Sequence, residues 1–288
     1  MSHFAVAGLQ LEASNQNNLY MLQSEIEATL RRSPELDMVV LGELATYGSK
    51  PSTAQPAGGE AEQAYQDMAA RLGIWLIPGS LFEKDGDANY NTAPVINPNG
   101  EVIARYRKVF PFTPYEAATT PGDGFVVFDV PDVGRVGLCI CYDIWYPEVA
   151  RTLAWMGAEF IVCPTMTNTI DREVELCLAR STAAVNQCYV MSLNVTGPLG
   201  NGQSITVDPH GTVMHQAGAG QELIEINVDF DEVRRSRESG VLGLCQTLKS
   251  FRDNTVPFPP YQENAESPYL DALGPVCVPN KEEKKNRS

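Results

Sequence analysis

The sequence predicts an α/β protein in which two β-sheets are stacked and helices cover their outer faces. Short apolar runs, which are typical of buried strands, alternate along the chain with longer segments whose apolar residues recur at helical spacing. This alternation falls into two sets, so we expect each half of the chain to supply one sheet and its helices. No linker rich in Gly, Ser or Pro divides the halves, which favours one compact unit.

The first half opens with a β–α–β unit whose second strand ends at Glu43. Open α/β sheets place their ligands at the carboxyl ends of strands, so Glu43 lies where a site is expected. A later hairpin strand runs into Lys108, which also terminates a strand. The elements expected here are strands over 4–11, 37–43 and 74–80, helices over 17–31 and 60–72, and a hairpin of strands 90–96 and 101–106 across Asn97-Pro98-Asn99-Gly100.

In the second half, a strand over 136–140 feeds a tight turn at Cys141 and then a helix that begins at Pro147. This arrangement presents a nucleophile at a strained corner, with the following backbone N–H groups free to face a ligand. The other elements expected are strands over 160–164 and 189–195, helices over 172–185 and 231–239, a hairpin of 204–207 with 212–215, and a strand over 223–228 that closes the sheet.

The domain is expected to span residues 1–240, followed by a tail over 241–288. Prolines cluster at Pro257-Phe258-Pro259-Pro260, and the chain ends in a charge run over 281–287. We expect the tail to be extended and to pack on the domain or on a partner subunit, with its last few residues disordered.

The composition excludes several classes of partner. There are 36 Asp and Glu against 21 Lys and Arg, a net charge of -15, so nucleic acid and anionic membranes are not expected as partners. No apolar run is long enough to span a bilayer, the N-terminus does not look like a secretion signal, and the seven cysteines are scattered. We therefore expect a cytoplasmic protein. The three histidines lack the spacing of a zinc site, so no metal is expected.

Glu43, Lys108 and Cys141 together form a set suited to amide hydrolysis. A carboxylate in a partly dry pocket has a raised pKa and can take the proton of a thiol nucleophile. A lysine ammonium and the backbone N–H of Tyr142 would then stabilise the tetrahedral oxyanion. Taken singly, Cys141 would be a buried structural thiol and Lys108 a solvated cation, so the hypothesis depends on their combination.

Further residues are candidates for contact with the substrate. Glu116 lies on a proline-rich loop over 109–122, where it would orient the amide or the hydrolytic water and hold Lys108 in place. Tyr142 and Trp145 line the pocket or merely pack the turn. Tyr115 is a further candidate. Thr167 and Asn168 are also candidates, and a simple loop role is equally compatible with these two.

These residues resemble the Glu–Lys–Cys signature of the nitrilase superfamily of carbon–nitrogen hydrolases, in the same order along the chain. The resemblance runs from the first strand to about Asp231. It implies a four-layer αββα sandwich of two mixed sheets, no cofactor, a homodimer or larger homo-oligomer, and a thioester acyl-enzyme on Cys141. It is carried by Gly42-Glu43, Asn91-Thr92, Asn99-Gly100-Glu101, Arg107-Lys108, Ile140-Cys141-Tyr142-Asp143, Pro147-Glu148, Asn186-Gln187-Cys188-Tyr189-Val190 and Asp208-Pro209-His210-Gly211-Thr212-Val213.

Within that superfamily, Tyr106-Arg107-Lys108 followed by the loop segments Pro114-Tyr115-Glu116 and Pro121-Gly122 is similar to the aliphatic amidase and formamidase branch. The resemblance implies that Glu116 is a second catalytic glutamate. The chain departs from the branch between these segments, where Ala-Ala-Thr-Thr replaces bulky aromatic residues, and this predicts a roomier acyl pocket. Two other departures, Val185 in place of a glutamate and Gln203 in place of a histidine, weaken any transfer of substrate identity.

The sequence therefore predicts a thiol amidohydrolase that releases ammonia from a small or medium carboxamide. An N-carbamoyl hydrolase is an alternative that would use a cation for the substrate carboxylate, with Arg172 and Arg180 as candidates. A nitrilase is another, because the same thiol can attack a nitrile. A catalytically silent binding protein is the alternative from a different class, since a fold does not fix a function.

Overall fold

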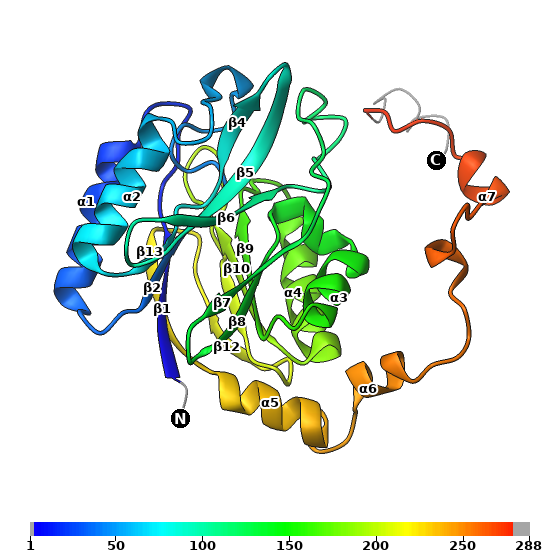
Figure 1. The fold of residues 1–288 in the computed structure, drawn as a ribbon. Helices are drawn as coiled ribbons and strands as arrows, with labels where there is room; N and C mark the ends of the chain where they lie inside the picture. The colour runs from blue at the N-terminus through cyan, green and yellow to red at the C-terminus, as the bar shows by residue number, and fades with distance from the viewer. Residues whose placement is uncertain (1–2, 279–288) are drawn as a thin grey trace.

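The computed structural model describes residues 3–278 and shows four layers, in which two β-sheets are stacked between pairs of helices (Figure 1). The predicted αββα sandwich of two mixed sheets is confirmed. Within residues 3–278, no helix is both long and apolar enough to cross a membrane.

The first sheet has the strand order β13-β1-β2-β3-β5-β4, with β6 paired to β5. Strands β1, β2 and β3 are parallel, and the other pairings in this sheet are antiparallel. The strands are β1 (His3–Gln10), β2 (Met38–Leu41), β3 (Trp75–Ile77), β4 (Leu81–Asp85), β5 (Ala88–Ile96), β6 (Val102–Arg107) and β13 (Glu222–Asp229).

The second sheet has the order β12-β11-β10-β9-β8-β7. Its central strands β8, β9 and β10 are parallel, and hairpins form both edges. The strands are β7 (Val126–Val130), β8 (Gly134–Leu138), β9 (Phe160–Thr165), β10 (Tyr189–Asn194), β11 (Ile205–Val207) and β12 (Val213–Gln216).

Helices α1 and α2 cover the first sheet, and α3 and α4 cover the second (Figure 1). Each presents an apolar stripe to its sheet, such as Leu22 and Ile26 on α1. The helices of the domain are α1 (Leu19–Arg32), α2 (Glu60–Leu72), α3 (Pro147–Trp155), α4 (Arg172–Asn186) and α5 (Phe230–Ser239), with 3-10 turns η1 (Pro51–Thr53) and η2 (Cys141–Trp145).

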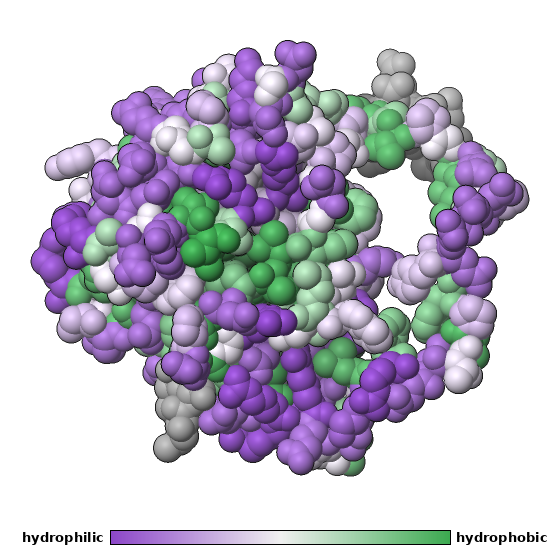
Figure 2. Space-filling view, in the orientation of Figure 1, coloured by the Kyte–Doolittle hydropathy of each residue, from purple (hydrophilic) through white to green (hydrophobic). Residues whose placement is uncertain are grey.

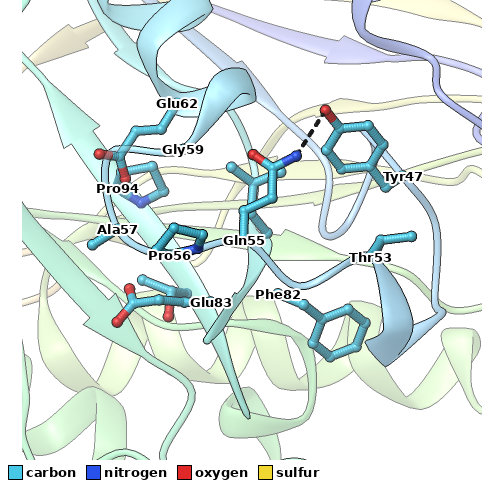
Figure 3. Close-up of a pocket in the computed structure, with 12 residues that line it drawn as sticks. Tyr47, Thr53, Gln55, Pro56, Ala57, Gly59, Glu62, Phe82, Glu83 and Pro94 are labelled. Carbon is cyan, nitrogen blue, oxygen red and sulfur yellow. Dashed lines mark hydrogen bonds between the residues drawn. The ribbon is translucent and has the colours of Figure 1, made fainter. Parts of the chain in front are cut away.

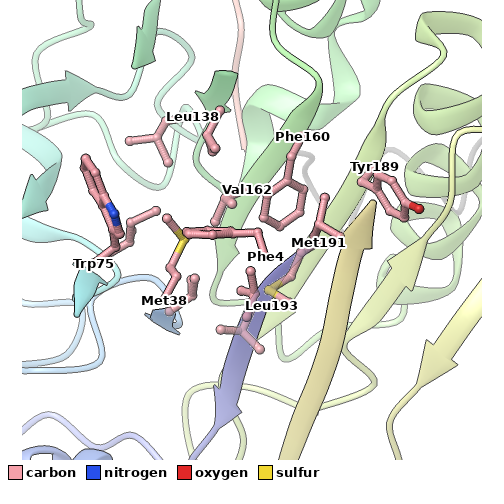
Figure 4. Close-up of a cluster of buried hydrophobic side chains, with 14 of the residues drawn as sticks. Phe4, Met38, Trp75, Leu138, Phe160, Val162, Tyr189, Met191 and Leu193 are labelled. Carbon is pink, nitrogen blue, oxygen red and sulfur yellow. The ribbon is translucent and has the colours of Figure 1, made fainter. Parts of the chain in front are cut away.

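The main core lies between the two sheets (Figure 4). In β2, Met38 and Val40 face this core, whereas Val39 and Leu41 face the helices. Because both faces of the strand are buried, its sequence is a continuous apolar run rather than an alternating pattern. Side chains that meet in the core are Phe4, Met38 and Trp75 from the first sheet and Leu138, Phe160, Val162, Met191 and Leu193 from the second.

Three details differ from the sequence analysis. Strands β4 and β7 were not predicted. The strand expected to close the second sheet is β13, which instead pairs with β1 in the first sheet, with Phe4 opposite Val228. The tight turn at Cys141 is a full 3-10 turn, η2.

The tail leaves the sandwich after Gly240 and contains α6 (Thr247–Arg252), η3 (Pro259–Tyr261) and α7 (Pro268–Asp271). Phe251 packs edge-on against Trp155, with 5.9 Å between ring centroids, and Tyr261 donates a hydrogen bond to Glu148. Beyond these contacts the chain arches round the side of the sandwich, and a gap lies between the middle of this arch and the sandwich (Figures 1 and 2). The charge run over 281–287 lies outside the described residues.

Candidate active site

The ends of three strands bring Glu43, Lys108 and Cys141 together. In the first sheet, Glu43 lies two residues after β2 and Lys108 directly follows β6. Cys141 comes from the second sheet, where it lies three residues after the end of β8. Lys108 Nζ is 2.9 Å from Glu43 Oε1 and 2.8 Å from Glu116 Oε2. Cys141 lies beside this pair, on the wall of a cavity that Glu43, Lys108 and Glu116 also line. The four residues that we expect to be catalytic therefore meet at one cavity.

The centre of this group is almost completely buried, with Lys108 1% and Glu43 2% exposed. Burial raises the pKa of Glu43, and Lys108 opposes that shift only in part. Burial alone would lower the pKa of Lys108, but Glu43, Cys141 and Glu116 together raise it well above its usual value. Lys108 is therefore a fixed positive charge between carboxylates.

Burial, followed by the negative charge of Glu43, raises the pKa of Cys141 well above its ordinary value, although Lys108 and the Met166 backbone N–H act in the opposite direction. The resting sulfur is therefore a thiol. A base must take its proton as it attacks, and Glu43 lines the same cavity as the sulfur and acts on it electrostatically.

Glu43 is fixed from two sides. Asn91, which is fully buried on β5, donates a hydrogen bond of 2.8 Å to Glu43 Oε1. The preceding residue, Gly42, packs so closely that a Cβ there would lie 2.5 Å from Val195 Cγ1 and 3.3 Å from the carbonyl oxygen of Thr165. A glycine at this position therefore lets the end of β2 approach the second sheet.

Asp143 holds the nucleophile turn, in which Cys141 has a left-handed φ of 47°. Its carboxylate accepts hydrogen bonds from the N–H of Ile140 at 2.8 Å, the hydroxyl of Tyr106 at 2.7 Å and the N–H of Phe110 at 2.8 Å. These bonds link the turn to the strand and loop that carry Lys108. Asp143 belongs to the motif Ile140-Cys141-Tyr142-Asp143, but no sequence pattern indicates this structural role.

Cys141 lies on the wall of a cavity of about 560 Å³. Four of the predicted substrate residues, Tyr115, Tyr142, Thr167 and Asn168, line this cavity. Trp145 does not; its indole N–H points to Glu175, 3.4 Å away, so it packs the turn. A neighbouring cavity of about 290 Å³ shares the Cys141 wall and reaches the other three catalytic candidates, Glu43, Lys108 and Glu116.

A third cavity, of only about 20 Å³, lies away from this centre and is lined by residues such as Gln55, Glu62 and Glu83 (Figure 3). It has room for about one water molecule. None of the catalytic candidates lines it.

Glu175 is a site residue that the sequence analysis missed. It is buried at the first turn of α4 and lines the cavity of about 560 Å³. Thr167 Oγ1 lies 3.8 Å from Cys141 Sγ and donates a hydrogen bond of 3.0 Å to Glu175 Oε1. Helical spacing alone placed Glu175 on a helix but gave no sign that this turn faces the nucleophile.

The structure contradicts the proposed role of Arg172 and Arg180 as receptors for a substrate carboxylate. Arg172 is buried and donates to Glu175 at 2.8 Å, to Ser192 and to the carbonyl oxygen of Gln203. Arg180 is directed at the carbonyl oxygen of Gly211. Neither side chain lines the cavity at Cys141.

Comparisons with known proteins agree with this arrangement. The family model described as carbon-nitrogen hydrolase matches residues 4–238. The omega-amidase NIT2 of Homo sapiens is 32% identical over 258 residues, which cover 83% of this chain and 93% of that protein.

Two solved structures are similar to this chain over most of its length. The Saccharomyces cerevisiae Nit3 structure, described as a member of branch 10 of the nitrilase superfamily, has a TM-score of 0.76 and 29% identity, covering 82% of this chain and 94% of that one. A mutant amidase from Nesterenkonia sp. AN1 has a TM-score of 0.72 and 25% identity, with coverage of 82% and 94%. Its active-site cysteine carries the acetamide moiety of fluoroacetamide.

Proposed function

Because this chain belongs to the carbon–nitrogen hydrolase family of the nitrilase superfamily, we propose that it hydrolyses a carboxamide to a carboxylic acid and ammonia through a thioester on Cys141. The observation that carries the proposal is the buried ion pair of Glu43 with Lys108 on the wall of a cavity that Cys141 also lines, next to the cavity of about 560 Å³ at Cys141. That volume is typical of small-molecule sites and larger than a short amide needs.

In the acylation step, Glu43 takes the thiol proton as the sulfur attacks the amide carbonyl carbon. The oxygen becomes an oxyanion, which the Lys108 ammonium and the Tyr142 N–H stabilise. When the intermediate collapses, the carbon–nitrogen bond breaks and Glu43 returns the proton to the nitrogen, so that ammonia leaves. The acyl group remains on the sulfur as a thioester.

In the deacylation step, Glu43 takes a proton from water, and the resulting hydroxide attacks the thioester carbonyl. The carbon–sulfur bond breaks, the carboxylic acid is released, and Glu43 returns its proton to the sulfur. Glu116 accepts hydrogen bonds from Lys108 and from the N–H of Phe112, so it fixes the ammonium on the side opposite Glu43.

The decisive experiment compares ammonia release by the wild-type protein and the Cys141→Ala variant over a panel of amides, nitriles and N-carbamoyl compounds. We expect the wild-type protein to be active on amides and the variant to be inactive. Cys177→Ala removes an exposed thiol and is the matched control, which should retain activity. Mass spectrometry after treatment with fluoroacetamide should show one carboxamidomethyl group on Cys141.

Other outcomes would replace this proposal. Activity on nitriles alone would indicate a nitrilase, and silence of the wild-type protein on the whole panel would indicate a binding protein. An N-carbamoyl amino acid hydrolase is disfavoured, since Arg172 and Arg180 are engaged elsewhere. Placement in the aliphatic amidase and formamidase branch remains a prediction; the relatives described above are by name an omega-amidase, a member of branch 10 of the nitrilase superfamily and an amidase.

We also propose that the chain forms a homodimer or a larger homo-oligomer. Support comes from apolar side chains that the described tail leaves exposed, among them Leu270 and Leu273.

A further inference from the structure

The charge of the cavity at Cys141 bears on the substrate. The charged residues that line the cavity of about 560 Å³ are Asp171 and Glu175, and no Lys, Arg or His from the described part of the chain lines it. A substrate that fills this cavity therefore meets carboxylates and neutral groups.

The cations in the neighbourhood are already engaged. Arg172 is buried in its ion pair with Glu175, and Lys108 is held between Glu43 and Glu116. Lys50 follows the lining residue Ser49 in sequence, but it is exposed and does not line the cavity. None of these is a free cation within the cavity.

Asp171, by contrast, is not neutralised. Its Oδ1 accepts a hydrogen bond from the Thr169 hydroxyl, and it forms no ion pair with a cation in residues 3–278. Backbone donors do not compensate, because the N–H groups of Val174 and Glu175 donate to the carbonyl oxygen of Asp171. The start of α4 thus offers the substrate a carboxylate rather than a set of free donors.

The aromatic wall of the cavity also suits a cationic guest. Phe112 stacks on Tyr115 with 5.1 Å between centroids and lies 4.9 Å from the Tyr142 ring. Aromatic faces attract ammonium groups and also cover the methylenes that lead to them.

We propose that the preferred substrate is a carboxamide whose acyl chain carries an ammonium group at its far end, which Asp171 and the aromatic wall receive. This inference rests on the proposed amidase function. The preferred substrate would therefore carry a positive charge at its far end. An amide with a carboxylate at that end would find no cationic side chain in the cavity.

Three amides of nearly equal length provide the test: 5-aminopentanamide, hexanamide and adipamate, which end in ammonium, methyl and carboxylate. We expect kcat/KM for ammonia release to be highest for the ammonium compound and about tenfold or more lower for the carboxylate compound. Binding to the Cys141→Ala protein, measured by calorimetry, should follow the same order and does not depend on turnover.

Two variants test whether the charge of Asp171 causes this preference for the ammonium compound. Asp171→Asn keeps a side chain that can accept from Thr169 but removes the charge, so the ratio of the ammonium to the carboxylate compound should fall several-fold. Glu173→Gln is the matched control: it removes one charge two residues away, but its exposed side chain does not line the cavity, so the ratio should stay unchanged.

The outcomes separate the two proposals. If hexanamide is hydrolysed but adipamate is preferred to 5-aminopentanamide, or if Asp171→Asn leaves the ratio unchanged, the inference is wrong and the amidase function stands. If no compound of the larger amide panel releases ammonia while the Cys141→Ala protein still binds the ammonium compound best, the amidase function fails and the binding preference is retained. If the Cys141→Ala protein binds the three amides without preferring the ammonium compound, the inference is wrong whether or not the wild-type protein hydrolyses amides.

Discussion

Glu43 is the residue whose change tests the proposed chemistry most directly, because it pairs with Lys108 and lines the same cavity as the nucleophile Cys141. In the Glu43→Gln variant, the neutral amide can still accept a hydrogen bond from Lys108 but cannot take the thiol proton. We expect kcat to fall roughly 100- to 10,000-fold. Ammonia release under saturating amide measures this loss.

The pH profile distinguishes loss of a base from general damage. Because burial raises the pKa of Glu43, wild-type activity should fall as the pH drops through that raised value, and the variant should lack this acid limb. Glu159→Gln is the control, since Glu159 is a buried carboxylate that pairs with Arg234 away from the cavity. An acid limb that persists in Glu43→Gln would assign the base to another residue.

Asp143 gives a prediction about stability. Burial raises its pKa from 3.8 to about 6. The folded protein therefore holds a proton that the unfolded chain releases near pH 4, so stability from this group is fully present below pH 3.8 and is lost as the pH rises through about 6. The loss amounts to about 3 kcal/mol.

Urea unfolding of the wild-type protein and the Asp143→Asn variant at about pH 4 and about pH 8 checks this prediction. The variant replaces one of the two accepting oxygens by an NH2 group, so the hydrogen bonds to that oxygen are lost and the variant should be less stable at both values. The gap between the two proteins should narrow by about 3 kcal/mol at the higher pH, because only the wild-type protein loses the contribution of the proton. If the free energy of unfolding changes with pH equally in both proteins, the raised pKa does not belong to Asp143.

At the scale of elements, the approach of β2 to the second sheet depends on Gly42. In the Gly42→Ala variant, the new methyl group would lie 2.5 Å from Val195 Cγ1 and 3.2 Å from its backbone nitrogen. Overpacking of this kind costs about 1–3 kcal/mol. It should also move Glu43, so we expect a lower free energy of unfolding and a lower kcat together.

Gly124→Ala is the matched control, because a Cβ at Gly124 meets no atom within 4 Å. Urea unfolding and ammonia release should both be close to wild-type there. Full activity in Gly42→Ala would mean that the strand end adjusts without disturbing the carboxylate.

Elements with strong local patterns could be predicted from the sequence, whereas short polar edge strands could not. The helix over 60–72 has the predicted bounds, because its apolar stripe is regular and Gly73 ends it with a left-handed φ of 67°. Strand β4 ends in exposed polar residues, so only the Asp85-Gly86-Asp87 turn marked its hairpin. Strand β13 was recognised as a strand, but its pairing with β1 joins distant parts of the chain, and no local pattern encodes that.

The site residues, like the strands, could be predicted only where a local sequence pattern marks them. Glu43, Lys108 and Cys141 end strands, and strand ends can be located from sequence. Glu175 and Asn91 lie inside regular elements, so their positions beside the catalytic group depend on how the sheets and α4 pack. Trp145 was predicted either to line the pocket or to pack the turn. Its indole points to Glu175 on α4, and the sequence does not show that these two residues meet.

At the scale of the whole molecule, the site forms only where the two sheets meet. The first sheet and the loop after it supply Glu43, Lys108 and Glu116, and the second supplies Cys141 and Thr167. The large core between the sheets therefore sets the geometry of the catalytic group. This explains why the catalytic residues are far apart in sequence but almost completely buried together.

The tail gives the prediction that belongs to this scale. Leu270 and Leu273 are 59% and 69% exposed, and Val276 is 71% exposed, although all three are apolar. Side chains of this kind gain stability when a partner covers them. If a second copy is that partner, replacing both leucines by aspartate should weaken the oligomer, because two carboxylates would have to be buried against it.

Analytical ultracentrifugation of the wild-type protein and the Leu270→Asp, Leu273→Asp double variant measures the effect. We expect the double variant to dissociate at concentrations where the wild-type protein remains associated. A double variant of nearby tail residues, Glu263→Ala with Glu266→Ala, is the control; it changes exposed polar residues and should sediment as the wild-type protein does. A wild-type protein that sediments as a monomer would contradict the oligomer. If the wild-type protein and the leucine double variant associate equally, the contact lies elsewhere on the molecule.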